Sequence, residues 1–375
     1  MQRRQFIQRL GGAAAATLAL PTQAQAERNR IVLGQSAALS GPAAELGLQF
    51  QRGAKLYFER LNARGGINGR VIELRSLDDG YEPERCKANT ERLIREEVFA
   101  LFGYIGTPTS LAALPLATAA KVPFVAPFTG AQALRDPFNR YAFHVRASYF
   151  DETARIVNQL ASLGTKKIAV FHQNDSYGQA GLDGVTRAMK TLGLTPVATA
   201  TVERNSVEVA DAVKAITGAG PEAVVQISAY KSCAAFIRAA RKAGYGGGFY
   251  NVSFVGTAAL SRELGADARG VVVSQVMPYP FAPVSPLAGE YLAAGQGAAD
   301  FEVNYSSMEG YVAAKVLAEA LRRTTGASRE DLVGGLENLR EHDLGGFFVD
   351  FNARKHTGST FAEMTILTQD GRVRR

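Results

Sequence analysis

The sequence predicts an α/β protein built from two doubly wound parallel-sheet lobes joined by a hinge. Short apolar runs alternate with helical segments along almost the whole chain, which is typical of parallel sheets covered by helices on both faces. The length of 375 residues exceeds what one hydrophobic core usually holds. The alternation is interrupted once, around residues 141–148, and no low-complexity linker follows. We therefore expect the chain to cross between the lobes more than once.

Residues 1–26 are typical of an export signal. Three arginines and no acid precede an apolar run of small residues, and Ala24-Gln25-Ala26 supplies a cleavage site. The apolar run has about 10 residues, whereas a membrane span needs roughly 20. Arg3-Arg4-Gln5-Phe6-Ile7 resembles a twin-arginine signal, and an ordinary signal with two adjacent arginines is the alternative. We expect a periplasmic protein that begins near Glu27, without a lipid anchor because no cysteine follows the apolar run.

The charge balance and the cysteines exclude some classes of function. The chain has 42 Lys+Arg and 35 Asp+Glu, and removing the signal's three arginines leaves 39 against 35. This excess is dispersed and has no interleaved aromatic residues, so no nucleic-acid surface is predicted. Cys86 and Cys233 fall in segments assigned to different lobes. We expect two free, buried thiols and not a disulfide.

The first unit should start with a buried strand and end with a polar turn. Its first strand ends at Leu39-Ser40-Gly41-Pro42, and a long amphipathic helix then runs to Asn62, where Gly65 supplies a left-handed turn. Further strands are expected at 71–77, 101–105 and 123–125, and further helices at 83–98 and 111–120. This order gives a parallel sheet with its polar turns at one edge.

Two polar turns in residues 101–131 form the first candidate site. Thr107, Thr109 and Ser110 follow one expected strand, and Pro127-Phe128-Thr129-Gly130 follows the next. Both turns should lie at the carboxyl edge of the sheet, where ligands bind. Hydroxyls and free N–H groups at a helix start suit a carboxylate. The alternative is that Thr107 and Thr109 only cap the helix.

The second unit repeats the alternation. Asn174 to Gly178 is a polar turn after the strand at 167–172, comparable to the turns of the first unit. Helices are expected at 151–163, 179–192, 207–217, 231–243, 304–323 and 329–340, and strands at 196–202, 223–227, 249–254, 271–277, 347–351 and 363–368. The sequence therefore predicts two similar α/β units, although we find no repeated sequence.

Several motifs resemble those of type I periplasmic binding proteins, in particular the branched-chain amino-acid (leucine/isoleucine/valine) branch. The most specific pair is Leu39-Ser40-Gly41-Pro42 followed by the Leu61–Arg70 segment LNARGGINGR. Asp78-Asp79, the 123–129 segment, Asp175-Ser176-Tyr177-Gly178 and the 237–244 segment continue the similarity in the same order, from about residue 31 to residue 371.

The resemblance implies a fold of two lobes with three crossings and a function in transport. The N-terminal lobe would comprise residues 27–147 and 278–346, and the C-terminal lobe residues 148–277 and 347–375. Such proteins capture a solute by hinge closure and present it to an inner-membrane ABC permease, without catalysis or cofactor. We expect a monomer whose partner is a small amino acid or carboxylate.

The resemblance also assigns roles to individual residues. Thr107 falls at the hydroxyl that binds the ligand carboxylate, and the backbone carbonyl of Phe128 falls where the ligand ammonium is bound. Gly130 replaces a second carboxylate-binding threonine, so Thr129 or the N–H of Gly130 would take that role. Tyr177 matches the tyrosine that closes over the ligand. Two further residues complete the expected set, Ile105 at the end of its strand and Tyr230 beside the position of another family tyrosine.

Departures from the family pattern leave the ligand open. Ser253 stands where the family has the acid that binds the α-ammonium, and serine cannot neutralise a buried charge. Either Asp175 or Glu309 substitutes, or the ligand has no ammonium. The alternative for Asp175 is a turn or cap residue, and the alternative for Glu309 is a helix or lobe–lobe contact. The family disulfide is also missing, with Tyr81 and Gly106 in its places. Two ligand classes therefore stay open: an apolar amino acid, and an aromatic or aliphatic carboxylate without the amine.

The main rival class is an enzyme on a similar frame. We find no dinucleotide, P-loop or nucleophile-elbow motif. The four histidines show no metal-binding spacing: His144, His172, His342 and His356. His172 could reach the cleft, although a structural role is the alternative. We expect no enzyme, no metal and no cofactor. A ligand-sensing partner of a membrane receptor is a second alternative.

Overall fold

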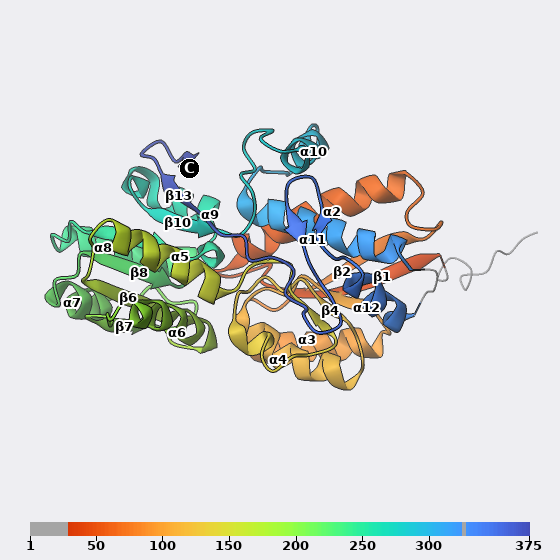
Figure 1. Ribbon diagram of the computed structural model, residues 1–375, viewed down its shortest axis with the longest axis horizontal. Helices are drawn as coiled ribbons and strands as arrows, with labels where there is room; N and C mark the ends of the chain where they lie inside the picture. The colour runs from red at the N-terminus through yellow and green to blue at the C-terminus, as the bar shows by residue number, and fades with distance from the viewer. Residues whose placement is uncertain (1–28, 325–327) are drawn as a thin grey trace, which may run out of the picture.

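The computed structural model describes residues 29–324 and 328–375, and these form two α/β lobes side by side (Figure 1). The expected export signal at 1–26 lies outside the described residues. Within the described ranges, none of the helices combines the length and the apolar character that a membrane span requires. The predicted fold class is confirmed.

The first lobe contains a five-stranded parallel sheet. Its order is β2-β1-β3-β4-β5. Helices α3 and α4 cover one face, and α2 and α11 cover the other (Figure 1). The elements of this layer are β1 (Arg30–Ala37), α2 (Ala44–Ala63), β2 (Val71–Asp78), α3 (Pro83–Arg95), β3 (Ala100–Phe102), α4 (Thr107–Ala119), β4 (Phe124–Val125), η1 (Gln132–Leu134), β5 (Ala142–Phe143) and α11 (Tyr305–Arg322).

Glycines allow α2 and α11 to pack at very short range. A Cβ on Gly53 would lie 1.8 Å from the carbonyl oxygen of Ser307, and one on Gly310 would lie 2.0 Å from that of Phe50. A larger residue at either position would push the helices apart. This contact holds α11, which comes near the end of the chain, against the helix layer of the first sheet.

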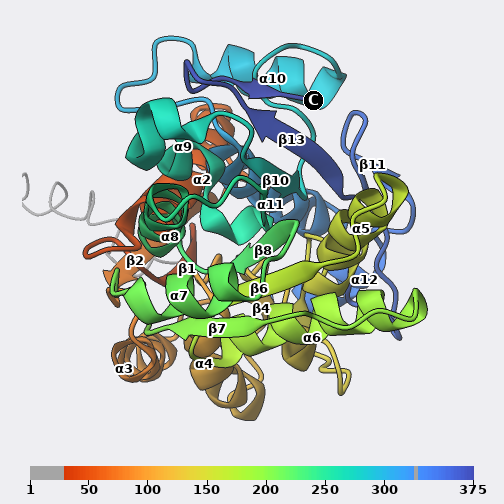
Figure 2. The ribbon, with the colours of Figure 1, turned by 90° about the vertical axis from the view of Figure 1, so that its left-hand side faces the viewer.

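The second lobe contains a seven-stranded mixed sheet. Its order is β14-β13-β10-β9-β8-β6-β7, and only the pairs made by β13 are antiparallel. Figure 2 shows α5 and α6 on one side of this sheet and α7, α8 and α9 on the other. The elements are α5 (Tyr149–Ser162), β6 (Ile168–Gln173), α6 (Ser176–Thr191), β7 (Thr199–Val202), α7 (Ala210–Gly218), β8 (Ala223–Ile227), α8 (Tyr230–Lys242), β9 (Gly248–Asn251), η2 (Ser253–Val255), α9 (Thr257–Leu264), η3 (Gly265–Ala268), β10 (Val272–Gln275), β13 (Glu363–Leu367) and β14 (Val373–Arg374).

The chain passes between the lobes before α5, after β10 and before β13. After β10 it returns to the first lobe through α10 (Pro286–Gly295), α11, α12 (Arg329–Glu337), β11 (His342–Asp343) and β12 (Phe348–Val349). Residues 351–358 also lie against the first sheet. Phe351 packs 5.7 Å from Phe143, and Thr357 forms a bridge with His144. The third crossing therefore follows Gly358, although the sequence placed residues from 347 onward in the C-terminal lobe.

Side chains explain several helix starts. Ser148 and Asp151 form a capping box at α5, and Asn304 and Ser307 form another at α11.

Cys86 and Cys233 are free and buried, as the sequence predicted.

Candidate functional site

Buried hydroxyls meet at the start of α4. The Oγ1 atoms of Thr107 and Thr129 lie 2.6 Å apart, and the Thr129 hydroxyl lies 3.4 Å from the Tyr149 hydroxyl. Thr107 is the first helical residue and makes no capping bond, because Gly106 occupies the cap with a positive φ of 97°. Thr109 instead donates to the carbonyls of its own helix start. The capping alternative for Thr107 is therefore wrong, and its hydroxyl faces the neighbouring turn.

Five aromatic rings join the two lobes above these hydroxyls, and we call them the ring cluster. Tyr81 and Phe128 come from the first lobe, Tyr177 and Phe254 from the second, and Tyr149 from the start of α5. The Phe254 centroid lies 4.6 Å from Tyr177, 5.5 Å from Phe128 and 5.9 Å from Tyr81. Tyr149 lies 5.4 Å from Tyr177. Thr107 and Tyr177 thus belong to one contact between the lobes, with Tyr149 between them.

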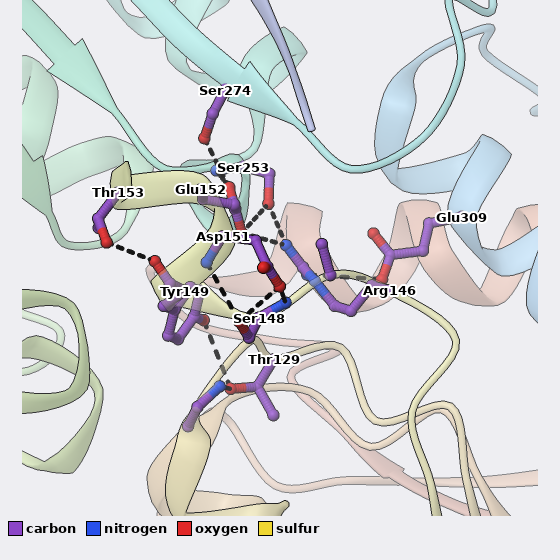
Figure 3. A network of polar contacts seen from close by, with 12 residues as sticks. Thr129, Arg146, Ser148, Tyr149, Asp151, Glu152, Thr153, Ser253, Ser274 and Glu309 are labelled. Atoms are coloured by element: carbon purple, nitrogen blue, oxygen red, sulfur yellow. Dashed lines mark hydrogen bonds and ion pairs between the residues drawn. The ribbon is translucent and has the colours of Figure 1, made fainter. Parts of the chain in front are cut away.

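A buried arginine, Arg146, lies between Glu152, Ser253 and Glu309 (Figure 3). The Arg146 side chain is 1% exposed and is held in the first crossing, between β5 and α5. Its guanidinium pairs with Glu152 at 3.3 Å and with Glu309 at 3.4 Å, and it donates to the Ser253 hydroxyl. It also lies 4.9 Å from the centre of the Phe128 ring. Since Glu152 and Ser253 belong to the second lobe and Glu309 to the first, Arg146 connects both.

The two glutamates have different surroundings. Glu152 accepts hydrogen bonds from the Ser253 N–H at 2.7 Å, the Ser253 hydroxyl at 3.0 Å and the Ser274 hydroxyl at 2.6 Å. Among the described residues, the partner of Glu309 is Arg146 alone, through the ion pair. Burial raises the pKa of Glu309 from 4.5 to about 7, although Arg146 opposes the shift. Glu309 is thus the carboxyl of this network that changes charge near neutral pH.

A second buried arginine fixes the loop that carries the hydroxyls. Arg135 donates to the carbonyl oxygens of Ala131 at 2.8 Å, Thr129 at 3.3 Å and Arg146 at 3.3 Å. Burial and the charge of Arg146 lower the pKa of Arg135 to about 10, so it stays protonated at neutral pH. It positions Thr129 and Arg146 relative to each other.

The structure brings together most of the residues that the sequence singled out. Thr107, Phe128, Thr129, Tyr177 and Ser253 all lie at this contact between the lobes. The other three lie as follows: Gly130 accepts from the Tyr149 N–H at 2.7 Å, Ile105 is buried beneath the site in a bridge with Phe128, and Tyr230 lies at the rim beside Glu45 and Arg262.

The close approach of Tyr149 explains why residue 130 is glycine. A Cβ on Gly130 would lie 2.6 Å from Cδ1 of Tyr149. The tyrosine therefore fills the space that a threonine side chain would need, and its hydroxyl reaches Thr129.

Sequence reasoning missed Arg146, Tyr149 and Phe254. The one available signal for Arg146 was a charged residue within the interruption around 141–148. The two acids considered as ammonium partners have other roles: Asp175 caps α6 and pairs with Arg204 at 3.1 Å, and Glu309 pairs with Arg146 across the lobes. His172 bonds to the carbonyl of Gln173, and burial lowers its pKa.

The lobes are closed on each other in this conformation. At one rim Arg204 pairs with Glu82 at 2.9 Å, and at the other Arg262 pairs with Glu45 at 2.7 Å and Glu302 at 2.6 Å. A cavity of about 10 Å³, room for about one water molecule, remains between the lobes. Its lining includes Phe128, Ser253, Gln275, Met277, Tyr305 and Glu309. A solute therefore enters only when the lobes separate.

Comparisons with known proteins agree with this architecture. A family profile described as periplasmic binding protein matches residues 30–372. An amino acid binding protein of Pseudomonas aeruginosa is 25% identical over 336 residues, which are 88% of this chain and 87% of the relative. A Leu/Ile/Val-binding protein homolog of Brucella abortus is 24% identical over 366 residues, covering 89% and 87%.

Solved structures show the same arrangement. A possible leucine/isoleucine/valine-binding protein from Rhodopirellula baltica superimposes with a TM-score of 0.87 and 35% identity, covering 91% of this chain and 95% of that one. A substrate-binding periplasmic protein from Ralstonia solanacearum superimposes with a TM-score of 0.86 and 33% identity, covering 92% of this chain and 99% of that one. The chain belongs to the periplasmic binding protein family, as a type I member of the branched-chain amino-acid type.

Proposed function

We propose that this chain is the periplasmic substrate-binding protein of an ABC importer, and that it captures an amino acid or a related small carboxylate between its lobes. What supports the proposal is the placement of the Thr107 and Thr129 hydroxyls, 2.6 Å apart, at the start of α4 and under rings from both lobes. Relatives named as amino acid and Leu/Ile/Val-binding proteins point the same way.

In the open form, the ligand carboxylate would dock on the first lobe. The hydroxyls of Thr107 and Thr129, the N–H of Gly130 and the free N–H groups of the first turn of α4 would donate to its oxygens. The helix dipole favours an anion there. The second lobe would then bring Tyr177 and Phe254 over the ligand. Closure is favoured by the ligand only through the contacts it makes with that lobe.

The remaining parts of the proposal concern partners and route. The closed protein would deliver the solute to an inner-membrane ABC permease as a monomer, without chemical change and without a cofactor. Export would follow the twin-arginine route. Mass spectrometry of the released solute checks the absence of catalysis, because the solute should be recovered unchanged.

Calorimetry on matched variants tests the carboxylate site. A thermal-shift screen over amino acids, aromatic acids and aliphatic acids first identifies a ligand, since a ligand bound only by the folded state raises the melting temperature. Thr107→Val should then weaken binding by about tenfold or more, because a charge-assisted hydrogen bond is lost. Thr109→Val is the control, because the Thr109 hydroxyl bonds to its own helix. Affinities of Thr107→Val and the native chain within about twofold would refute the assignment.

A further inference from the structure

We propose that the solute is an apolar or aromatic carboxylate that carries no ammonium group, and that Arg146 sets this specificity. The inference rests on the proposed function and names the ligand class of the same site. Three features of the described residues carry it: arginine donors without acceptors, carboxylates that already have partners, and a buried guanidinium beside the Phe128 ring and Ser253.

Buried donors at the ring cluster have no acceptor. In residues 29–324 and 328–375, Nε and Nη1 of Arg146 and the hydroxyl of Tyr177 are buried without a hydrogen-bond partner. Nη1 lies 3.4 Å from Glu309 as an ion pair only. The amide oxygen of Gln173 is also unpaired, but one neutral acceptor cannot neutralise an ammonium. The arginine nitrogens can only donate, so they offer no acceptor to an ammonium, and the Tyr177 hydroxyl is as neutral as the Gln173 amide oxygen.

Two of the carboxylates near the rings already have their partners. Glu152 receives three hydrogen bonds from serine groups in addition to the guanidinium of Arg146. Asp175 accepts from the N–H groups of Tyr177 and Gly178, from the Gln173 amide and from Arg204. Neither carboxylate is available to a ligand ammonium.

Asp79 is partnered too, because it accepts from the Tyr81 N–H at 2.8 Å and the Ser36 hydroxyl at 2.7 Å. The surroundings of the next acid, Glu309, disfavour an ammonium as well. It faces Arg146, and burial raises the pKa of its carboxyl to about 7. Arg135 is buried as well and bonds to the carbonyl oxygen of Arg146, so two guanidinium groups lie on this side of the site. An ammonium near Phe128 would also approach the guanidinium that lies 4.9 Å from its ring. Like charges brought together in a buried site oppose binding.

The ring cluster indicates the rest of the ligand. The body of a ligand whose carboxylate lies at Thr107 would contact Phe128 of the first lobe and Tyr177 and Phe254 of the second. Aromatic side chains bury apolar and aromatic groups well. The guanidinium of Arg146 bonds to Ser253, the residue that stands where the family pattern has the ammonium-binding acid.

Matched ligand pairs test the proposal on the native chain. We compare phenylalanine with 3-phenylpropanoate and leucine with 4-methylpentanoate by thermal shift and calorimetry, because each pair differs only in the amine. The acid without the amine should bind at least about tenfold more tightly. An amino acid that binds as well as or better than its partner would overturn this inference and leave the proposed function standing. If none of the four compounds binds and the wider screen finds a ligand that carries an ammonium group, this inference alone is overturned; a screen in which no amino acid or carboxylate binds would overturn both.

Two variants separate the charge of Arg146 from its packing. Arg146→Lys keeps the positive charge and should retain the preference for the acid, whereas Arg146→Gln should reduce that preference by about tenfold or more. A preference that is unchanged in Arg146→Gln would overturn the role of Arg146. If Arg146→Gln does not fold, the same measurement is made on Arg146→Met combined with Glu152→Gln and Glu309→Gln, where an unchanged preference overturns the role and a reduced preference supports it.

Discussion

Removing the buried guanidinium of Arg146 should destabilise the protein strongly. Arg146 is 1% exposed and Glu152 is 0% exposed, so Arg146→Met leaves a buried carboxylate with only neutral donors. Breaking a buried pair from one side costs about 3–5 kcal/mol, and the lost contact with the Phe128 ring adds to this. Urea unfolding at pH 8, followed by circular dichroism, measures the change in the free energy of unfolding.

A matched surface variant and a combined variant make this test specific. Arg187 is exposed and lies 5.0 Å from the Phe150 ring, so Arg187→Met removes a similar stacked side chain at a cost of about 1 kcal/mol or less. Adding Glu152→Gln and Glu309→Gln to Arg146→Met should recover much of the loss, because neither carboxylate is then left without its guanidinium. A loss below about 1 kcal/mol for Arg146→Met alone would refute the reasoning.

Three further predictions concern pH, packing and closure. Burial raises the pKa of the Glu309 carboxyl from 4.5 to about 7, so its contribution to stability is full below about pH 4.5 and is lost as the pH rises through 7. Glu309→Gln should therefore make the melting temperature depend less on pH between about 4.5 and 7. A pH dependence of the melting temperature equal to that of the native chain would contradict the assignment. Gly53→Ala should lower the free energy of unfolding in urea by roughly 1–3 kcal/mol or more, because its Cβ would meet the backbone of α11. Gly334→Ala in α12 has open space around the new Cβ and should be neutral or stabilising by about 0.5–1 kcal/mol. Equal effects of the two variants would refute the packing argument. Replacing Arg204 and Arg262 by Gln should shift the ligand-free protein toward the open form, and an unchanged radius of gyration in small-angle scattering would show that these rim pairs do not hold it closed.

Local sequence patterns predicted the fold and the position of the polar turn that carries Thr107. Buried strands and amphipathic helices are specified by residues close in sequence, so the alternation of strands and helices could be predicted from the sequence. The rule that ligand loops gather at the carboxyl ends of parallel strands was enough to place the turn that carries Thr107 at the same sheet edge as the turn that carries Thr129. The antiparallel strand β13 was not predicted in its direction, because its partner β10 is distant in sequence.

Long-range pairing explains what the sequence did not reveal. Arg146 and Ser253 are 107 positions apart, and only the fold brings them into contact. The strand expected at 249–254 ends at Asn251, and Ser253 lies on the turn that follows, where its N–H and hydroxyl reach Glu152. Short strands also differ from the expectation, since β3 ends at Phe102 and Gly103 adopts a positive φ of 63° against Phe50.

A crystal structure of the protein with the most tightly bound carboxylate tests the central claim most directly. The account predicts a closed form in which the ligand oxygens lie within hydrogen-bond distance of Oγ1 of Thr107 and Oγ1 of Thr129, with Tyr177 and Phe254 over the ligand. A carboxylate bound elsewhere, or one turned away from these hydroxyls, would contradict it.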